Sequence, residues 1–221
     1  MHHVRYARAA PDNEKKKALH GAERDRPDVV QARVEFQEER SRIDPERLVA
    51  LDESAVDTSM TRLYARSPRG ERAVGSAPLA KAARLTIVGA LSTDGMLATQ
   101  ASEEAMSGSG FLTYLRERLI PELQRVKPDA VVVMDNLRPH RVKAVREMLL
   151  QAGLGLLYLP AYSPDLSPIE QAWSKFKAIL RTLATRTKES LLEAIDRALQ
   201  AITASDARGY FTHCGYGLAL N

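Results

Sequence analysis

Two short apolar runs in this chain each end at acidic residues, and this pattern most constrains the fold. LVALDES, residues 48–54, carries Asp52 and Glu53, and AVVVMDN, residues 130–136, carries Asp135. Runs of this length and composition are typical of strands buried inside a sheet. Open α/β sheets usually build their ligand sites at the carboxyl ends of such strands. The two runs therefore predict a sheet with carboxylates at its ligand-binding edge.

The rest of the chain alternates between strand and helix patterns. ARLTIVGALS, the pair Asp94-Gly95 and MLATQ predict an antiparallel hairpin, and LGLLYLP predicts a third buried strand. Apolar spacing and helix-end residues predict four helices. They cover residues 111–123, 141–153, about 167–183 and about 187–202. The expected fold class is α/β, with a central mixed sheet (an antiparallel meander plus parallel strands) flanked by helices.

A proline-rich loop delivers a third acid to the start of a helix. LPAYSPDLSPIEQAW, residues 159–173, places Glu170 in the first helical turn. One interpretation is a capping box between Ser167 and Glu170. The other is that Glu170 joins Asp52 and Asp135 in a site for a hard divalent cation, which prefers oxygen ligands. Capping alone does not explain the rigid, proline-rich approach.

The charge of the chain is unevenly distributed. The formal net charge is +4, and residues 138–188 contain nine Lys/Arg against three Asp/Glu. This excess fits a nucleic-acid partner, but without other evidence a solvated basic face is the simpler interpretation. The apolar runs are too short for a membrane span, and the N-terminus lacks the features of a secretory signal, so we expect a cytoplasmic protein. The single Cys214 excludes an intramolecular disulfide.

Two longer strings carry a family resemblance. VVVMDNLRPH and LLYLPAYSPDLSPIEQAWSKFK resemble the catalytic core of the DDE transposases of bacterial insertion sequences, in the mariner-related superfamily. LVALDESAV and ARSPRGERAVG resemble the first acidic block of the same family. The similarity runs from about Ala22 to Gly215, and the 34 residues between Asp135 and Glu170 match the family's spacing. The resemblance implies a ribonuclease H-like fold.

The resemblance also implies the chemistry. Asp52, Asp135 and Glu170 would form the catalytic, metal-binding triad, with two Mg²⁺ or Mn²⁺ ions per active site. The implied activity is metal-dependent cleavage of DNA at transposon ends and strand transfer to target DNA. Adjacent strand residues point to opposite sides, so the strand pattern leaves Asp52 and Glu53 as rivals for the cleft, and the family match favours Asp52. We expect Asp165 to cap the turn that follows the second proline of the loop.

Residues after the second acid are candidates for supporting roles. We expect Asn136 and His140 to orient Asp135 or contact phosphate, with a surface role for His140 equally open. Arg138 and Arg141 are candidate DNA-binding residues in the same segment.

The helix that begins near Glu170 has two distinct sides. Lys177 and Arg181 follow Glu170 by seven and eleven residues, which places all three on one face. The two cations are therefore candidate ligands for DNA phosphates, and simple solvated charge is the alternative. The opposite side carries an apolar stripe that we expect in the core: Ile169, Trp173, Phe176, Leu180 and Leu183.

The sequence predicts three regions along the chain. They are a charged N-terminal segment or linker over residues 1–47, a ribonuclease H-like DDE catalytic domain over 48–215 and a tail over 216–221. Within the first region, residues 28–43 predict an amphipathic helix whose apolar side contains Val30, Val34 and Ile43.

Complete members of the family begin with helix-turn-helix domains, for which 47 residues leave little room. The resemblance therefore implies several partners: DNA, as terminal inverted repeats and target; a second copy of the chain in a homodimer; and a separate N-terminal helix-turn-helix protein. An alternative function stays open, a non-catalytic DNA-binding or assembly remnant that modulates a full-length transposase. The intact triad favours the enzyme, and the missing N-terminal domain favours the remnant.

Overall fold

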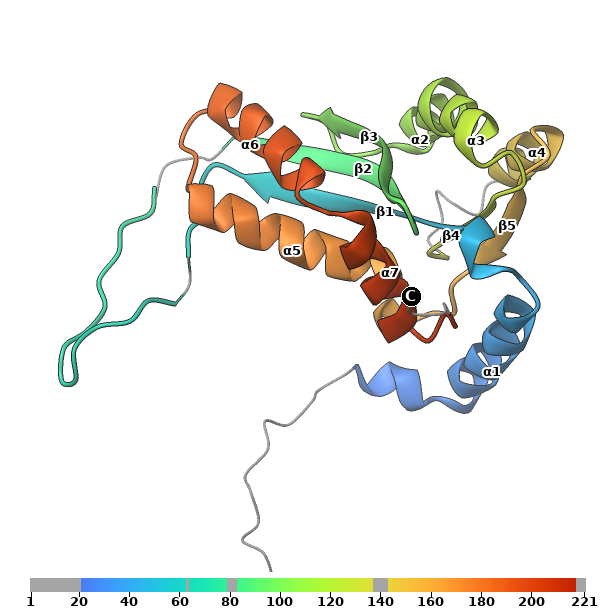
Figure 1. Ribbon diagram of the computed structural model, residues 1–221, viewed down its shortest axis with the longest axis horizontal. Coiled ribbons are helices and arrows are strands. Elements are labelled where there is room, and N and C mark those ends of the chain that lie inside the picture. The colour runs from blue at the N-terminus through green and yellow to red at the C-terminus, as the bar shows by residue number, and fades with distance from the viewer. Residues whose placement is uncertain (1–20, 63, 79–82, 137–142, 218–221) are drawn as a thin grey trace, which may run out of the picture.

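The computed structural model describes residues 21–62, 64–78, 83–136 and 143–217, arranged around a five-stranded sheet (Figure 1). The strands are β1 (Leu48–Asp57), β2 (Arg84–Ser92), β3 (Gly95–Ser102), β4 (Val131–Met134) and β5 (Gly155–Tyr158). Their order across the sheet is β3-β2-β1-β4-β5. β1, β2 and β3 form an antiparallel meander, while β4 pairs in parallel with both β1 and β5. The predicted mixed sheet is confirmed.

The hairpin between β2 and β3 differs by one residue from the prediction. Ser92 pairs with Gly95, so the two loop residues are Thr93 and Asp94. Gly95 begins β3 with a φ of 122°, a backbone conformation that glycine adopts without a steric penalty. The Asp-Gly signal therefore marks the hairpin correctly, but the glycine belongs to the strand.

Helices surround the sheet and connect its strands. The longer ones are α1 (Pro27–Ser41), α2 (Gly108–Tyr114), α3 (Ile120–Val126), α4 (Lys143–Gln151), α5 (Pro168–Leu183), α6 (Lys188–Gln200) and α7 (Ala204–His213). A π-helical stretch, η3 (Leu115–Leu119), joins α2 to α3. The 3₁₀ turns within the described ranges are η1 (Ala22–Asp25), η2 (Pro45–Arg47) and η5 (Pro164–Leu166). None of the helices in the described part of the chain is long and apolar enough to cross a membrane.

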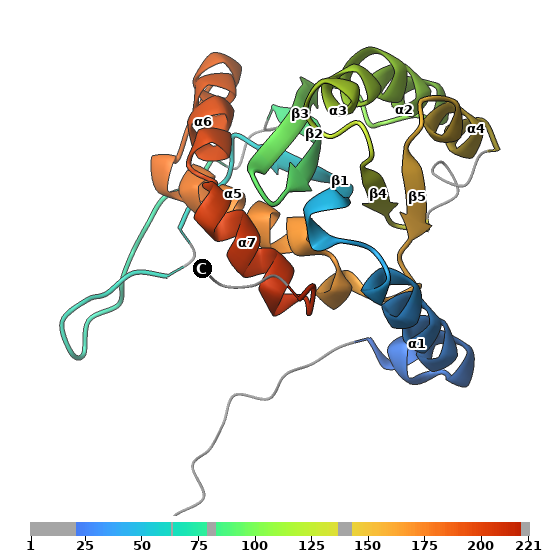
Figure 2. The ribbon, with the colours of Figure 1, turned by 45° about the vertical axis from the view of Figure 1, so that its right-hand side comes forward.

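The helices form two layers, one on each face of the sheet (Figures 1 and 2). Buried residues of α5, α6 and α7 pack on one face, and those of α2, η3, α3 and α4 pack on the other. Alternate side chains of β1 pack against the two helical layers, because successive strand side chains point to opposite faces of the sheet. Leu48 and Ala50 pack with the α5 layer, and Val49 and Leu51 pack with the α2 layer.

The predicted N-terminal helix is present as α1, but it buries a different side. Val29 and Phe36 are its buried residues, seven positions and therefore two turns apart. Val30 and Val34 are exposed, and Ile43 lies partly buried beyond the end of the helix. The predicted apolar side was wrong. The helix has two narrow apolar stripes, and the one with Val29 and Phe36 packs on the domain instead of the one with Val30 and Val34.

Candidate active site

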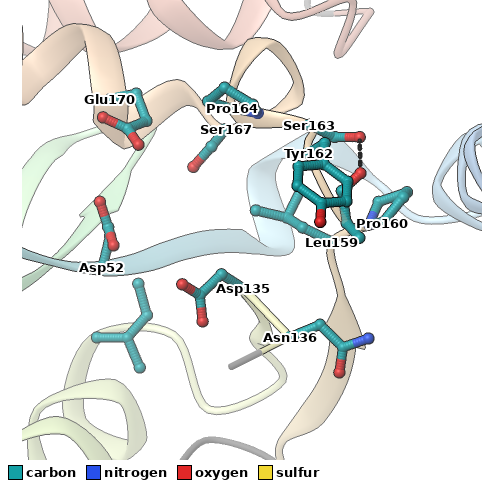
Figure 3. A pocket seen from close by; sticks show the side chains of 12 residues that line it. Asp52, Asp135, Asn136, Leu159, Pro160, Tyr162, Ser163, Pro164, Ser167 and Glu170 are labelled. Carbon is teal, nitrogen blue, oxygen red and sulfur yellow. Dashed lines mark hydrogen bonds between the residues drawn. The ribbon is translucent and has the colours of Figure 1, made fainter. Parts of the chain in front are cut away.

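A pocket of about 530 Å³ lies beside β1, at the ends of β4 and β5 and the start of α5. The carboxylates of Asp52, Asp135 and Glu170 line it and face one another in Figure 3. Asp52 comes from β1, Asp135 directly follows β4, and Glu170 lies in the first turn of α5. The fold thus brings together the three acids that the sequence singled out.

The pleat of β1 distinguishes Asp52 from Glu53. Leu48 and Ala50 pack with the α5 layer, and the two-residue period of a strand puts Asp52 on the same side. Glu53 falls on the opposite side, and of this pair only Asp52 lines the pocket. Asp52 is therefore the member of the pair that faces Asp135 and Glu170.

The same argument places Asp135. Val131 and Val133 of β4 pack with the α5 layer, and Asp135 continues their row. In the parallel register between the strands, Leu51 lies beside Met134. The next residue of each chain segment is an aspartate, so Asp52 and Asp135 emerge side by side from neighbouring strands.

Negative charge accumulates around Asp52. Burial is the largest cause that raises the pKa of Asp52 to about 7, and the charges of Glu170 and Asp135 raise it further. Hydrogen bonds from the backbone of Glu53 and the side chain of Trp173 oppose this rise only in part. A cation held beside the Asp52 carboxylate would stabilise its charged form.

The loop between β5 and α5 forms one wall of the pocket. Ser163 donates a side-chain hydrogen bond to the carbonyl of Ala161 at 3.0 Å (Figure 3). Tyr162 has a φ of 55°, a left-handed conformation that is unusual for a residue with a bulky side chain. Ser167 is the N-cap of α5, yet its side chain makes no capping hydrogen bond. The capping box considered for Ser167 and Glu170 is therefore not formed, and Glu170 is turned to the pocket.

The outer side of this loop contacts η1 and α1 near the N-terminus and Tyr216 near the C-terminus. Asp165 accepts two hydrogen bonds from Arg33 of α1, at 2.8 and 3.1 Å, and Arg24 lies 3.2 Å from it. Tyr216 donates a hydrogen bond from its hydroxyl to the carbonyl of Leu166 at 2.8 Å. The expected role of Asp165 as a local turn cap is thus replaced by a contact with α1, which no local sequence signal could reveal.

Arg40 of α1 fixes Tyr216 in turn. Its guanidinium lies 4.5 Å from the centre of the Tyr216 ring and donates to the carbonyl of Cys214 at 3.0 Å. Tyr216 is 2% exposed, so the segment predicted as a tail begins with a core residue. The remaining residues of that segment, beyond Gly217, lie outside the described part of the chain.

The acids fit a divalent cation by their chemistry. Three carboxylates supply the oxygen ligands that Mg²⁺ or Mn²⁺ prefers, and their mutual repulsion falls when a cation lies among them. As the side chains stand, no three His, Cys, Asp or Glu residues within the described ranges form a group that could hold a metal ion. The carboxylates therefore converge on one pocket from three elements without forming a closed ligand set in this structure.

The other predicted site residues fall in different places. Asn136 lines the pocket, and Figure 3 shows its amide directed away from the three carboxylates. Lys177 and Arg181 lie further along α5, half-buried and outside the pocket lining. Three further candidates lie outside the described residues: Arg138, His140 and Arg141.

One residue that contacts the site was assigned only to the core. Trp173 is buried, as the apolar stripe of α5 predicts, together with Ile169, Phe176 and Leu180. Leu183, at the end of the stripe, is instead exposed, because α5 ends there. The indole nitrogen of Trp173 also donates a hydrogen bond to Oδ2 of Asp52 at 3.1 Å. A buried tryptophan usually finds such a partner, so the apolar pattern alone could not exclude a polar role.

The chain resembles transposases of known structure. It is similar to the Mos1 transposase in a paired-end complex with the left transposon end, with 20% identity and a TM-score of 0.74. That match covers 92% of this chain and 63% of the Mos1 chain. The Mos1 catalytic domain, solved with raltegravir and Mn, matches with 15% identity and a TM-score of 0.67, over 90% of this chain and 92% of that one.

Sequence comparison identifies the family independently. Among curated proteins, no sequence matches the chain significantly. The sequence profile of the family described as DDE superfamily endonuclease matches residues 47–192, which is well over half of the chain. The protein therefore belongs to the DDE superfamily endonucleases, and its fold is the ribonuclease H-like fold of the Mos1 transposase catalytic domain.

Proposed function

We propose that the protein is the catalytic part of a DNA transposase, which cleaves phosphodiester bonds at transposon ends and joins the freed ends to target DNA. The observation that carries the proposal is the convergence of Asp52, Asp135 and Glu170 on one pocket. Support comes from the family, whose members are endonucleases, and from Mos1, whose structures include complexes with transposon ends and with Mn or Mg.

In this proposal the three carboxylates are the catalytic, metal-holding groups. Asp52 and Asp135 stand side by side at the sheet, and Glu170 closes the site from α5. Two bound divalent ions, Mg²⁺ or Mn²⁺, would supply activation of the attacking oxygen and stabilisation of the leaving oxygen in an in-line displacement. Leu159 contributes an apolar wall, which reduces the local dielectric and strengthens the field of the acids. The proposal assigns Asn136, which lines the pocket, to contact with a phosphate oxygen.

The proposal assigns the remaining parts of the chain to DNA binding and assembly. Residues 48–215 form the catalytic domain, and residues 1–47 connect it to a DNA-recognition function. The chain spans 63% of the length of the Mos1 transposase it matches. In this proposal, a helix-turn-helix partner recognises the terminal repeats, and a homodimer pairs the two ends.

The test is nicking of supercoiled plasmid by the purified chain in Mg²⁺ or Mn²⁺. Wild type should convert the plasmid to the open circle, and both Asp135→Asn and a chelator should abolish the conversion. Asp129→Asn is the matched control, because Asp129 precedes the same strand, is exposed and forms a surface ion pair with Arg47. It should nick as wild type does.

Each other outcome contradicts the proposal. Nicking by Asp135→Asn equal to that of wild type would remove Asp135 from the chemistry. A folded wild-type chain that binds DNA and metal but never nicks, even with DNA carrying transposon ends, would favour the non-catalytic remnant.

A further inference from the structure

The hydrogen bond between Trp173 and Asp52 joins two elements of the proposed active site. Trp173 is 2% exposed, and it lies on α5 three residues after Glu170. Its indole nitrogen can donate a hydrogen bond but cannot accept one. The 3.1 Å contact to Oδ2 therefore orients the Asp52 carboxylate from the same helix that carries Glu170.

The sheet leaves room for the indole at one position. Gly89 of β2 is paired with Asp52 in the antiparallel register. A Cβ at Gly89 would lie 3.3 Å from Cη2 of Trp173, 3.2 Å from Cε of Met96 and 3.0 Å from Cγ2 of Thr99. Such distances are tighter than nine in ten real Cβ contacts, so a Cβ at this position would require Thr99, Met96 and the Trp173 ring each to move by a few tenths of an ångström. The absence of a side chain at Gly89 thus permits the ring to sit beside Asp52.

A second aromatic residue holds the ring from within the core. Phe176, one turn further along α5, meets Trp173 edge to face, with ring centres 5.5 Å apart and planes at 65°. Such aromatic pairs have preferred geometries, so the ring is constrained at a defined angle. Phe176 is fully buried and is not among the residues that line the pocket, so substituting it perturbs the ring without removing the hydrogen-bond donor.

We propose that Trp173 is a positioning residue that sets the orientation of Asp52 for a divalent cation, with Gly89 providing the space for its ring. The inference rests on the proposed function, since it concerns the same carboxylates. Residues that hydrogen-bond a ligating carboxylate are known to tune metal sites, and losing one costs roughly 10-fold to 100-fold in metal affinity or activity. Through Trp173 and Glu170, α5 controls two of the three acids.

The first measurement is the indole N–H resonance in a ¹H–¹⁵N spectrum of the whole chain. The chain contains one tryptophan, so this resonance reports on Trp173 alone. Asp52→Ala removes the acceptor and should move the resonance, with or without metal. Addition of Mg²⁺ to wild type should shift it saturably. A resonance that ignores Asp52→Ala would show that the hydrogen bond does not form, and the inference would fall.

The second measurement is Mn²⁺ affinity by calorimetry for a set of variants. Trp173→Phe keeps an aromatic ring and removes the donor, so affinity should fall roughly 10-fold or more. Phe176→Leu keeps the indole donor but loosens the ring, so it should lower the melting temperature and reduce affinity by clearly less than Trp173→Phe does. Equal affinity for wild type and Trp173→Phe, or equal losses for both variants, would overturn the positioning role.

Two glycine variants distinguish crowding of the Trp173 ring by an added Cβ from the general effect of replacing a glycine with alanine. Gly89→Ala should weaken Mn²⁺ binding and move the indole resonance. Gly209→Ala lies in α7, where an added Cβ meets nothing within 4 Å, and should change neither. An unmoved indole resonance in Gly89→Ala would refute the assigned role of Gly89.

The proposed function and the positioning role fail in different ways. A wild-type chain that binds no Mn²⁺ contradicts the metal-dependent function itself, and the positioning role falls with it. A wild-type chain that binds Mn²⁺ and nicks DNA, beside a Trp173→Phe variant that does both equally well, contradicts the positioning role alone.

Discussion

Arg33 and Asp165, 132 residues apart in the chain, form an ion pair with two hydrogen bonds on the outer side of the loop that leads to Glu170. Burial alone would raise the pKa of Asp165, but hydrogen bonds and charge from Arg33, with the charge of Arg24, outweigh it and hold that pKa below its usual value. The Arg33 side chain is 13% exposed, so the pair is better shielded than most surface pairs. The helix before the central sheet therefore stabilises one wall of the pocket.

Loss of this pair should destabilise the fold measurably. Arg33→Ala should lower the free energy of unfolding in urea by about 1 kcal/mol, at the upper end for partly exposed pairs because the contact has two charge-assisted bonds. Arg26→Ala is the matched control, since Arg26 makes the same two-bond contact with Asp28 but both side chains are more than half exposed. Its unfolding curve should overlay that of wild type. Equal losses of unfolding free energy in both variants would show that the Arg33 contact stabilises the fold no more than an exposed surface pair does.

The two adjacent acids of β1 should behave differently. Asp52→Asn should abolish plasmid nicking, whereas Glu53→Gln should retain it, because the pleat turns only Asp52 to the pocket. The change of charge is the same in the two variants, so general electrostatics cannot account for a difference. Loss of nicking in Glu53→Gln with Asp52→Asn still active would reverse the assignment.

The cations of α5 should affect how DNA binding depends on salt. Each phosphate contact contributes about 0.9 to the slope of log affinity against log salt, so Lys177→Gln combined with Arg181→Gln should reduce the slope by roughly 1.8. The control is Arg118→Gln with Arg125→Gln, two exposed arginines on the helices of the opposite layer. Fluorescence anisotropy with labelled duplex DNA at several salt concentrations measures the slope for each double variant. A slope unchanged by the α5 variants would leave Lys177 and Arg181 as solvated charges.

The contact between α5 and α7 should make stability depend on pH in acid. A hydrogen bond from Lys175, followed by those from the backbone and hydroxyl of Thr203, lowers the pKa of Asp206 to about 2. Because this folded pKa lies below the unfolded value, the stabilisation is fully present above about pH 4 and is lost as pH falls toward 2.

Asp206→Asn tests this dependence. The variant should be less stable than wild type by about 1 kcal/mol at pH 6, after allowance for the partial exposure of the pair, and the difference should shrink toward pH 2. Urea unfolding at several pH values measures it. A difference that stays constant from pH 6 to pH 2 would mean that the ionised form of Asp206 makes no contribution.

Elements defined by local pattern were predictable from the sequence. The apolar runs that became β1 and β4 are long enough and uninterrupted enough to identify strands, and the stripe from Ile169 to Leu180 identified the buried side of α5. The convergence of the three acids followed from strand ends and from the family resemblance. These features depend on neighbours within one or two turns of the chain, or on a spacing that can be read directly.

Features that depend on distant partners were not predictable. Asp165 was expected to serve its own turn, because nothing near it indicates Arg33. The buried side of α1 was missed because Val29 and Val30 are equally apolar, and only the position of the domain decides between them. Trp173 fits a core stripe so well that its polar contact with Asp52 leaves no trace in the pattern.

The sheet and the helix make unequal contributions to the dimensions of the site. Backbone hydrogen bonds between β1 and β4 keep Asp52 and Asp135 at the separation of adjacent strands, about 4.8 Å between backbones. Glu170, in contrast, belongs to α5, and side-chain packing holds this helix against the sheet. The distance from Glu170 to the two aspartates therefore depends on how α5 packs on the sheet. Substitutions in the core beneath α5 offer a way to widen or narrow the pocket without changing a carboxylate.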